Sequence, residues 1–161
     1  MAATVEWHCF TGAVPTDDGV IGLGLDLCSA DNDAYSAANR TANPVILSEY
    51  SYEKWMDLKI TAAPDNWIST FRIWGDGTIA ANTTLRAGSI LAGAQPVDTV
   101  SIVAVNDFNA MVVLSKWTFD ATVYTLINSW TKFLVFQLYA GAAAAPGDWG
   151  PYTVYYDYTE A

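Results

Sequence analysis

The chain has 161 residues, of which 52% are hydrophobic, so one domain of this length can bury a core without disulfides or a metal. Acidic residues outnumber basic residues by 17 to 7, which gives a net charge of −10. Because the basic residues are also scattered along the chain, this charge disfavours binding to nucleic acid and to anionic membranes.

No targeting or membrane-spanning segment is expected. The chain has no run of about 18 uncharged apolar residues, the length that a membrane-spanning helix needs. The first ten residues, MAATVEWHCF, lack the basic segment of a signal peptide, so we expect synthesis in a cytoplasm. There Cys9 and Cys28 are expected to be thiols. Without carboxylates, these two cysteines and the single His8 do not fill a four-ligand zinc site, so we expect no zinc.

The N-terminal third is predicted to contain short strands and long loops. Residues rich in β-branched and aromatic side chains predict a strand over Thr4–Phe10. Turn-forming residues predict a loop over Ala13–Gly19, and leucines at alternate positions predict a second strand over Val20–Cys28. Ser29–Pro44 is expected to be a long polar loop, followed by a short edge strand at Val45–Leu47.

The middle of the chain carries the clearest strand signals. Apolar and polar residues alternate in Tyr52–Thr61, and they alternate less regularly in a second run, Trp67–Trp74. A Pro-Asp-Asn turn joins the two runs, so we expect a strand pair. Both faces of Thr131–Ala140 are mostly apolar, which predicts an interior strand that packs on the apolar face of this pair.

The rest of the chain supplies further short strands and turns. The predicted strands are Thr83–Ala87, Asp98–Val105, Val112–Phe119, Ala121–Ile127 and Tyr152–Tyr158, with Asp120 as a break, a turn at Asn106–Asn109 and a loop at Gly141–Gly150. About eight to ten strands with frequent turns predict an all-β fold, an antiparallel β-sandwich or jelly roll that forms a single domain over residues 1–161.

Sequence motifs for catalysis are absent. There is no Gly-x-Ser-x-Gly motif and no glycine-rich phosphate loop, and any catalytic triad would have to use His8. Strand neighbours point to opposite faces, so His8 and Cys9 do not form a nucleophile pair. A pair of carboxylates for glycoside hydrolysis is left open, because its spacing is spatial. We expect no enzyme and assign no catalytic or cofactor-binding residue.

One acidic loop offers oxygen ligands of the kind that calcium prefers. Asp31, Asn32 and Asp33 follow one another, and Asp26 is near in sequence. The next ligand position of a calcium loop is occupied by Tyr35, and a closing glutamate is missing. Turn and capping chemistry by Asp and Asn side chains explains the loop more simply, so no metal ligand is assigned.

Aromatic side chains are unusually abundant. Such residues form the core of a domain, enrich protein interfaces, or bind sugars by stacking, and all three interpretations apply here. The residues concerned are Trp55, Trp67, Trp74, Trp117, Trp130, Trp149, Tyr152, Tyr155, Tyr156 and Tyr158.

Four short strings give the chain a resemblance to a known group of proteins. They are SYEKW at 51–55, FRIWGDG at 71–77, TLRAG at 84–88 and PYTVYYDY at 151–158. In these strings and their order the chain resembles small virion proteins encoded among the structural genes of tailed phages. The resemblance implies a non-enzymatic β-sandwich of the virion that decorates a capsid or belongs to a tail or neck. It implies partners among other virion subunits, and homo-oligomeric or lattice contacts.

Overall fold

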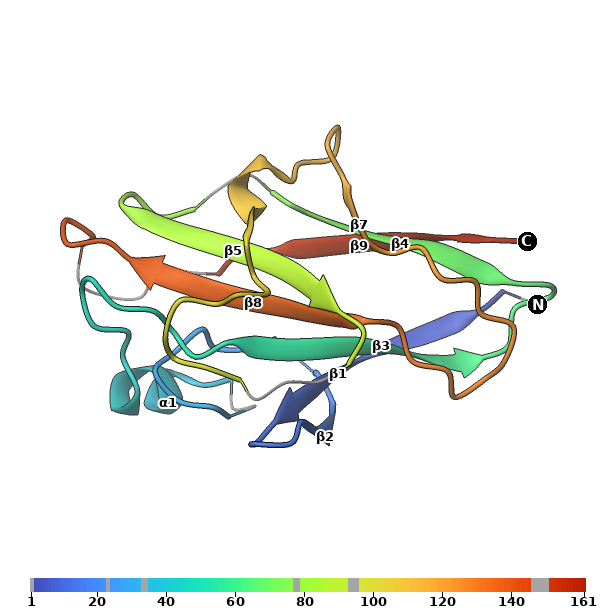
Figure 1. Cartoon of the computed structure of the whole chain (residues 1–161), viewed down its shortest axis with the longest axis horizontal. Helices are drawn as coiled ribbons and strands as arrows, with labels where there is room; N and C mark the ends of the chain where they lie inside the picture. The colour runs from blue at the N-terminus through green and yellow to red at the C-terminus, as the bar shows by residue number, and fades with distance from the viewer. Residues whose placement is uncertain (1, 23, 33–34, 77–78, 93–95, 146–150) are drawn as a thin grey trace.

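The computed structural model describes residues 2–22, 24–32, 35–76, 79–92, 96–145 and 151–161. Two antiparallel sheets face each other across a core (Figure 1). Sheet A has the strand order β2-β1-β3-β8-β5-β6, and sheet B has the order β7-β4-β9. Nine strands in two sheets confirm the predicted all-β sandwich.

The strands of sheet A are β1 (Thr4–Thr11), β2 (Thr16–Val20), β3 (Lys54–Ala62), β5 (Thr83–Ile90), β6 (Asn106–Asp107) and β8 (Phe133–Ala140). Those of sheet B are β4 (Ile68–Gly75), β7 (Trp117–Asp120) and β9 (Val154–Glu160). Two short helical turns complete the described elements, α1 (Ala37–Ala42) and a 3-10 turn, η1 (Phe108–Ala110).

An inner core fills the space between the sheets. Leu58 and Ile60 of β3 face it, as the alternation in the sequence predicts. From sheet B, Phe71 contributes a ring that lies near the rings of Phe119, Tyr124 and Tyr158. The ends of the described chain meet beside this core, where Ala3 N donates to Glu160 Oε1 at 2.5 Å and the Tyr158 hydroxyl donates to Ala3 O.

A second, outer core lies on the other face of sheet A. Trp55, Val135 and Ala104 are fully buried there, and Ala104 belongs to the irregular segment 97–105, which covers the sheet. A Cβ on Gly88 would lie 1.8 Å from the Val103 carbonyl oxygen, so only glycine permits this close approach. The outer core gives sheet A two buried faces, as the apolar sequence of β8 predicts.

The predicted strand Asp98–Val105 is wrong, and side-chain hydrogen bonds give the reason. Ser101 N donates to Gln137 Oε1 of β8 at 2.8 Å, while Ser101 Oγ accepts from the backbone of Val103 and Ala104. These bonds satisfy the backbone groups that a neighbouring strand would otherwise pair. The expected turn at Asn106–Asn109 is replaced by β6 and η1.

The second strand lies earlier in the chain than predicted. β2 starts within the expected loop Ala13–Gly19, and the predicted strand Val20–Cys28 is wrong beyond its first residue. The Asp17 carboxylate links β2 to β1, because it lies 2.8 Å from Nδ1 of His8 in β1. The same carboxylate accepts a hydrogen bond from Gly19 N. Gly24 has a φ of +137°, which interrupts the regular strand backbone that the leucines predict.

The polar loop Ser29–Pro44 contains the helix α1. Ser36 is its N-cap, and the Ser36 hydroxyl accepts from the backbone of Asn39. The predicted edge strand Val45–Leu47 is wrong, because the chain turns there and Ser48 adopts a φ of +67°. In the expected loop Gly141–Gly150, residues 141–145 are described and contain no helix or strand, while 146–150 lie outside the described residues.

The two central strands are correctly located but do not pair. β3 belongs to sheet A and β4 to sheet B, so the turn between them crosses the sandwich. β8 does not pack face to face on this pair as expected; it lies beside β3 in the same sheet, with Trp55 opposite Val135. Alternation predicts a strand with one buried face and does not identify its neighbour.

Two predicted strands in the C-terminal half are shorter or absent. Val112–Phe119 is regular only in β7, which begins at Trp117 and ends at Asp120, the predicted break. Ala121–Ile127 forms one isolated bridge, between Tyr124 and Ile68, and no strand. The Asp120 carboxylate accepts from Thr122 N, which turns the chain out of the sheet.

Candidate interaction surfaces

The structure divides the tryptophans and tyrosines between core and surface. Trp55 is fully buried in the outer core, and Trp67, Trp117 and Trp130 are half-buried. Trp149 lies outside the described residues. The aromatic residues on the outer face of sheet B are Trp74 of β4 and Tyr155 of β9, which are opposite each other in register. Tyr155, at 46% exposed, is the most exposed tryptophan or tyrosine among the described residues.

A row of three side chains crosses sheet B, from β7 over β4 to β9. The rings of Trp74 and Tyr155 are stacked, with centres 5.8 Å apart and planes at 16°. The Nζ atom of Lys116 lies 4.1 Å from the centre of the Trp74 ring. The ring of Trp74 therefore contacts both the lysine that precedes β7 and the tyrosine of β9.

An ion-pair network fixes the row. The Asp157 carboxylate accepts from Arg72 Nε and from Lys116 Nζ, each at 2.6 Å. Burial alone would raise the pKa of Asp157, but the bonds to Lys116 and Arg72 outweigh it and lower the pKa. Because the Trp74 ring is engaged by both Lys116 and Tyr155, the ring of Tyr155, which is 46% exposed, is the surface of this row on which a sugar could stack.

Exposed aliphatic side chains gather on three loops of the chain between β5 and β8. Leu114 is 93% exposed and Ile102 is 90% exposed, values typical of residues with no contact in the isolated chain. The loops run over sheet A and along the margins of sheet B (Figure 1). The exposed residues are Leu91, Val100, Ile102, Val105, Val113, Leu114, Val123, Leu126 and Ile127.

Most of the described side-chain oxygens of the acidic loop are bonded within the protein, while the buried Oδ1 atom of Asp31 has no hydrogen-bond partner. Asp26 accepts from Ser36 N, from Asn39 Nδ2 and from Arg40 Nη1, and these bonds lower its pKa against the opposing effect of burial. Asp31 accepts from Gly12 N, while Asp33 lies outside the described residues. Among the described residues no group of three or more His, Cys, Asp or Glu side chains is placed to hold a metal ion. The loop shows the capping and turn chemistry of Asp and Asn.

Lys54 is buried beneath this loop. Its Nζ donates to the backbone oxygens of Ala30 and Asn32, at 2.7 and 2.8 Å. Burial lowers its pKa, although the nearby Cys28 and Cys9 sulfurs oppose the effect. Both cysteines are buried thiols. A lysine with a lowered pKa suits covalent chemistry, but this one is enclosed and bonded to two carbonyls, so it holds the loop in place.

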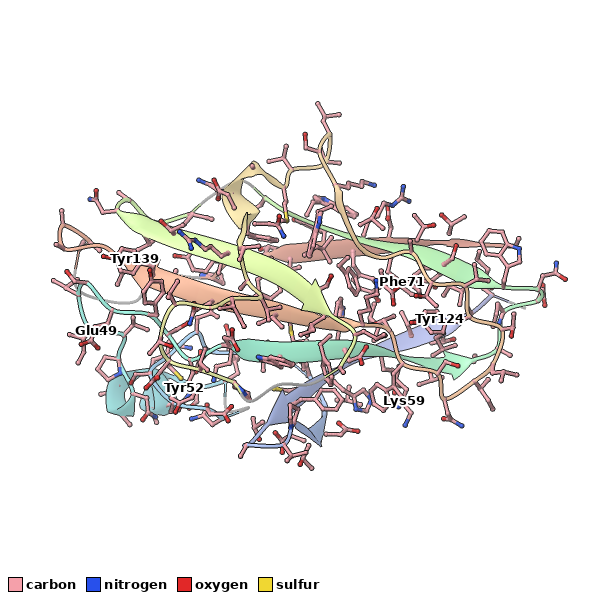
Figure 2. The ribbon with its side chains drawn as sticks, in the orientation of Figure 1. Glu49, Tyr52, Lys59, Phe71, Tyr124 and Tyr139 are labelled. Carbon is pink, nitrogen blue, oxygen red and sulfur yellow. The ribbon has the colours of Figure 1, made fainter. Side chains whose placement is uncertain are left out.

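A third polar group lies where segment 121–132 passes from sheet B to sheet A. Figure 2 shows Tyr124 beside Phe71 at one end of the sandwich, at the same end as Lys59 and far from Tyr139. Asp57 and Asp120 are both buried there. The sequence pattern marks Asp120 only as a break between two strands, and it marks Asp57 as a solvent-facing residue of an alternating strand. A signal for Asp57 was its place on the same strand face as the buried Trp55.

His8 packs against Trp130 of this region. It is buried, its Nδ1 bonds Asp17, and its ring lies edge-on to Trp130 with centres 4.9 Å apart. Its Nε2 atom is buried without a hydrogen-bond partner, so no substrate reaches it. The arrangement is that of a packed structural histidine.

Comparison of the chain with protein-family models found no matching family, and neither curated proteins nor solved structures gave a match. Within the described residues, no helix has the length and apolar character needed to cross a membrane.

Proposed function

We propose that the chain is a non-enzymatic structural protein of a phage virion that functions by binding other virion subunits. Two roles in the particle fit this proposal: a capsid decoration protein, or a component of the tail or neck. The four sequence strings that resemble such proteins support this proposal, as does the sandwich fold. The protein would be synthesised in the host cytoplasm and act in the particle, with contacts to capsid or tail subunits and between its own copies.

The observation that carries the proposal is the set of exposed aliphatic side chains on the three loops. A folded chain gains nothing from exposing Ile102 and Leu114 almost completely, whereas a protein interface buries such groups at its centre. The net charge of −10 keeps the free protein soluble and disfavours nucleic acid as the partner. Contacts made only in the particle stabilise the assembled state by mass action.

The test uses particles of the phage that encodes the chain. We expect mass spectrometry to detect the protein in purified particles, and Ile102→Asp and Leu114→Asp to reduce its incorporation at least about tenfold while the free protein still folds. Val14→Asp, a change at an exposed residue of the β1–β2 turn, is the matched control and should incorporate normally. Absence of the protein from particles would disprove the proposal.

A carbohydrate-binding module for host attachment is the second candidate. One observation favours it, the exposed outer ring of Tyr155 next to the charged Asp157 and Arg72. Binding in a glycan array that Tyr155→Ala abolishes and Tyr156→Ala retains would support this function. If no glycan binds at millimolar concentration, this second function is ruled out.

A further inference from the structure

The two sheets end in four edge strands, β2 and β6 in sheet A and β7 and β9 in sheet B. Natural proteins protect such edges by keeping them short, or by placing lysine, proline, a bulge or a covering segment on them. Three of these edges are short, with five residues in β2, two in β6 and four in β7. β9 has seven residues, and its sequence VYYDYTE contains no lysine and no proline. It is the least protected edge strand in the described part of the chain.

The hydrogen-bond register shows which backbone groups of β9 face the open edge. Trp67 and Ala161 exchange two backbone bonds between β4 and β9. The next residue, Ile68, exchanges its two bonds with Tyr124, on the other side of β4. In an antiparallel pair, residues that bond the neighbouring strand alternate with residues that point away from it. Glu160 is the register partner of Ile68, so its N–H and C=O groups point away from β4.

The other end of β9 gives the same result. Gly75 N donates to Met111 O at 2.6 Å, in the segment that leads into β7, so Gly75 does not bond its register partner Val154. The register shift between Ser69 and Arg72 adds its extra residue to β4, so the alternation along β9 is unbroken. The residues whose backbone groups face the open edge are Val154, Tyr156, Tyr158 and Glu160. Within the described residues, no further hydrogen bond reaches these backbone groups.

Exposed tyrosine rings lie on both faces of β9. Tyr156 is 39% exposed on the inner face, where its ring lies edge-on to the Trp7 ring with centres 5.5 Å apart. Tyr155 is 46% exposed on the outer face. A further strand would lie about 4.8 Å from β9, within reach of the side chains on both faces. Strand addition would therefore bury two aromatic rings as well as the open backbone groups.

Charge indicates which kind of strand fits this edge. The Asp157 carboxylate is neutralised by its ion pairs with Arg72 and Lys116. The Glu160 carboxylate accepts from an uncharged group, Ala3 N. Because each chain carries a net charge of −10, two copies repel each other, whereas a basic segment is attracted. The edge therefore favours a basic partner over a second copy of the chain.

The two faces of β9 require different side chains of such a partner. On the outer face, a cation beside Tyr155 would gain the kind of contact that Lys116 makes with the Trp74 ring. On the inner face, an apolar side chain would pack against Tyr156 and the edge of the inner core. Because strand side chains alternate between faces, the matching segment alternates basic and apolar residues.

We propose that the open edge of β9 binds an extended segment of another protein in which apolar and basic residues alternate. The segment adds a fourth strand to sheet B through the outward backbone groups of β9. The identity of the partner rests on the proposed function, by which the segment belongs to another virion subunit. The contact uses residues other than those of the three aliphatic loops, so the chain has a second interface of a different kind.

The test uses the free, isotope-labelled protein and a synthetic peptide of about eight residues that alternates valine and lysine. We expect the peptide to shift the NMR amide signals of Tyr156, Tyr158 and Glu160 in a saturable way, and to slow their hydrogen exchange at least about tenfold. Exchange at Tyr155 and Asp157, which bond β4, should not change. A matched peptide that alternates valine and glutamate should bind at least about tenfold more weakly.

Two variants test the edge itself. Tyr156→Pro removes one outward N–H and leaves the bonds to β4, so it should fold and bind the valine–lysine peptide at least about tenfold more weakly. Tyr156→Phe is the matched control and should bind like the parent. If Tyr156→Pro fails to fold, Thr159→Lys replaces it, because a lysine on the exposed outer face of β9 should repel the peptide without changing the ladder.

Three results would overturn the proposal. The first is no binding at millimolar peptide, and the second is binding that neither Tyr156→Pro nor Thr159→Lys weakens. The third is a dimer of the free protein in which the outward amides of β9 are already protected, because a second copy would then be the occupant. The peptide experiment needs no phage particle. It can therefore fail while the protein is found in particles, or succeed while the protein is absent from them, which separates this proposal from the proposed function.

Discussion

The ammonium group of Lys116 is centred over the indole of Trp74, 4.1 Å from the ring centre, while it also bonds Asp157. A half-buried cation on an aromatic face stabilises a fold by about 0.5–2 kcal/mol. The contact also orders Trp74 against Tyr155, so the row across sheet B acts as one unit.

We therefore predict that Lys116→Met lowers the free energy of unfolding by about 1 kcal/mol, because it keeps the apolar stem and removes the charge. Urea denaturation at low salt measures the loss. Lys132→Met is the matched control and should change stability by less than about 0.5 kcal/mol. Equal losses in the two variants would show that the contact with Trp74 contributes nothing.

A substitution at Gly88 tests how segment 97–105 packs over the outer core. In Gly88→Ala the new Cβ meets the Val103 carbonyl, so we expect segment 97–105 to lift and stability to fall by about 2 kcal/mol or more. Thermal unfolding measures the loss of stability, and the total tryptophan fluorescence, to which Trp55 contributes, reports the lifting of the segment. Gly22→Ala is the control, because a Cβ there meets no atom within 4 Å. A Gly88→Ala protein as stable as the parent would contradict the packing described.

The buried Asp57 makes stability depend on pH. Its pKa is 3.8 when unfolded and about 7 when folded, so between these values the folded chain holds a proton that the unfolded chain has lost. The free energy of unfolding therefore falls as pH rises through this window, by up to about 4 kcal/mol from this group, and this contribution is constant above it. Asp57→Asn should lack this slope in urea denaturation from pH 4 to 8. An unchanged slope would assign the effect to another group.

Asp26 tests whether the acidic loop has a structural role or a metal role. Asp26→Ala removes the acceptor for Ser36, Asn39 and Arg40, so we expect a loss of about 2–3 kcal/mol in the free energy of unfolding. EDTA and calcium should each leave the melting temperature of the parent protein unchanged. A fall of several degrees in EDTA would show that the loop holds calcium.

The fold class can be predicted from the sequence because apolar and polar residues alternate clearly in the segments with the strongest strand signals. Each of four predicted strands matches an observed strand whose ends lie within two residues of the predicted bounds: Thr4–Phe10, Tyr52–Thr61, Trp67–Trp74 and Thr131–Ala140. The neighbours of these strands cannot be predicted in the same way. The alternation in β3 shows that one face is buried, but it does not show whether β4 or β8 is the strand that pairs with it. Distant contacts decide between these arrangements.

The polar sites were harder to predict for a related reason. Asp57 and Asp120 are 63 residues apart in the sequence, and their hydrogen bonds join strands and a crossing segment that no local pattern connects. The sequence predicts a strand over Asp98–Val105, which is rich in β-branched residues, yet the side chains of Ser101 and Gln137 bond its backbone. Side-chain bonds of this kind replace a ladder without altering hydropathy.

The bonds that tie Ala3 to Glu160 and Tyr158 have a consequence for the order of assembly. β9 is an edge strand of the three-stranded sheet, and its residues Tyr158 and Glu160 bond Ala3 at the start of the described chain. The two sheets therefore cannot complete the inner core until residue 160 has left the ribosome. Most contacts join distant parts of the chain, which slows folding. We expect a nascent chain that ends before β9 to stay open and dependent on chaperones, with closure as a single late event.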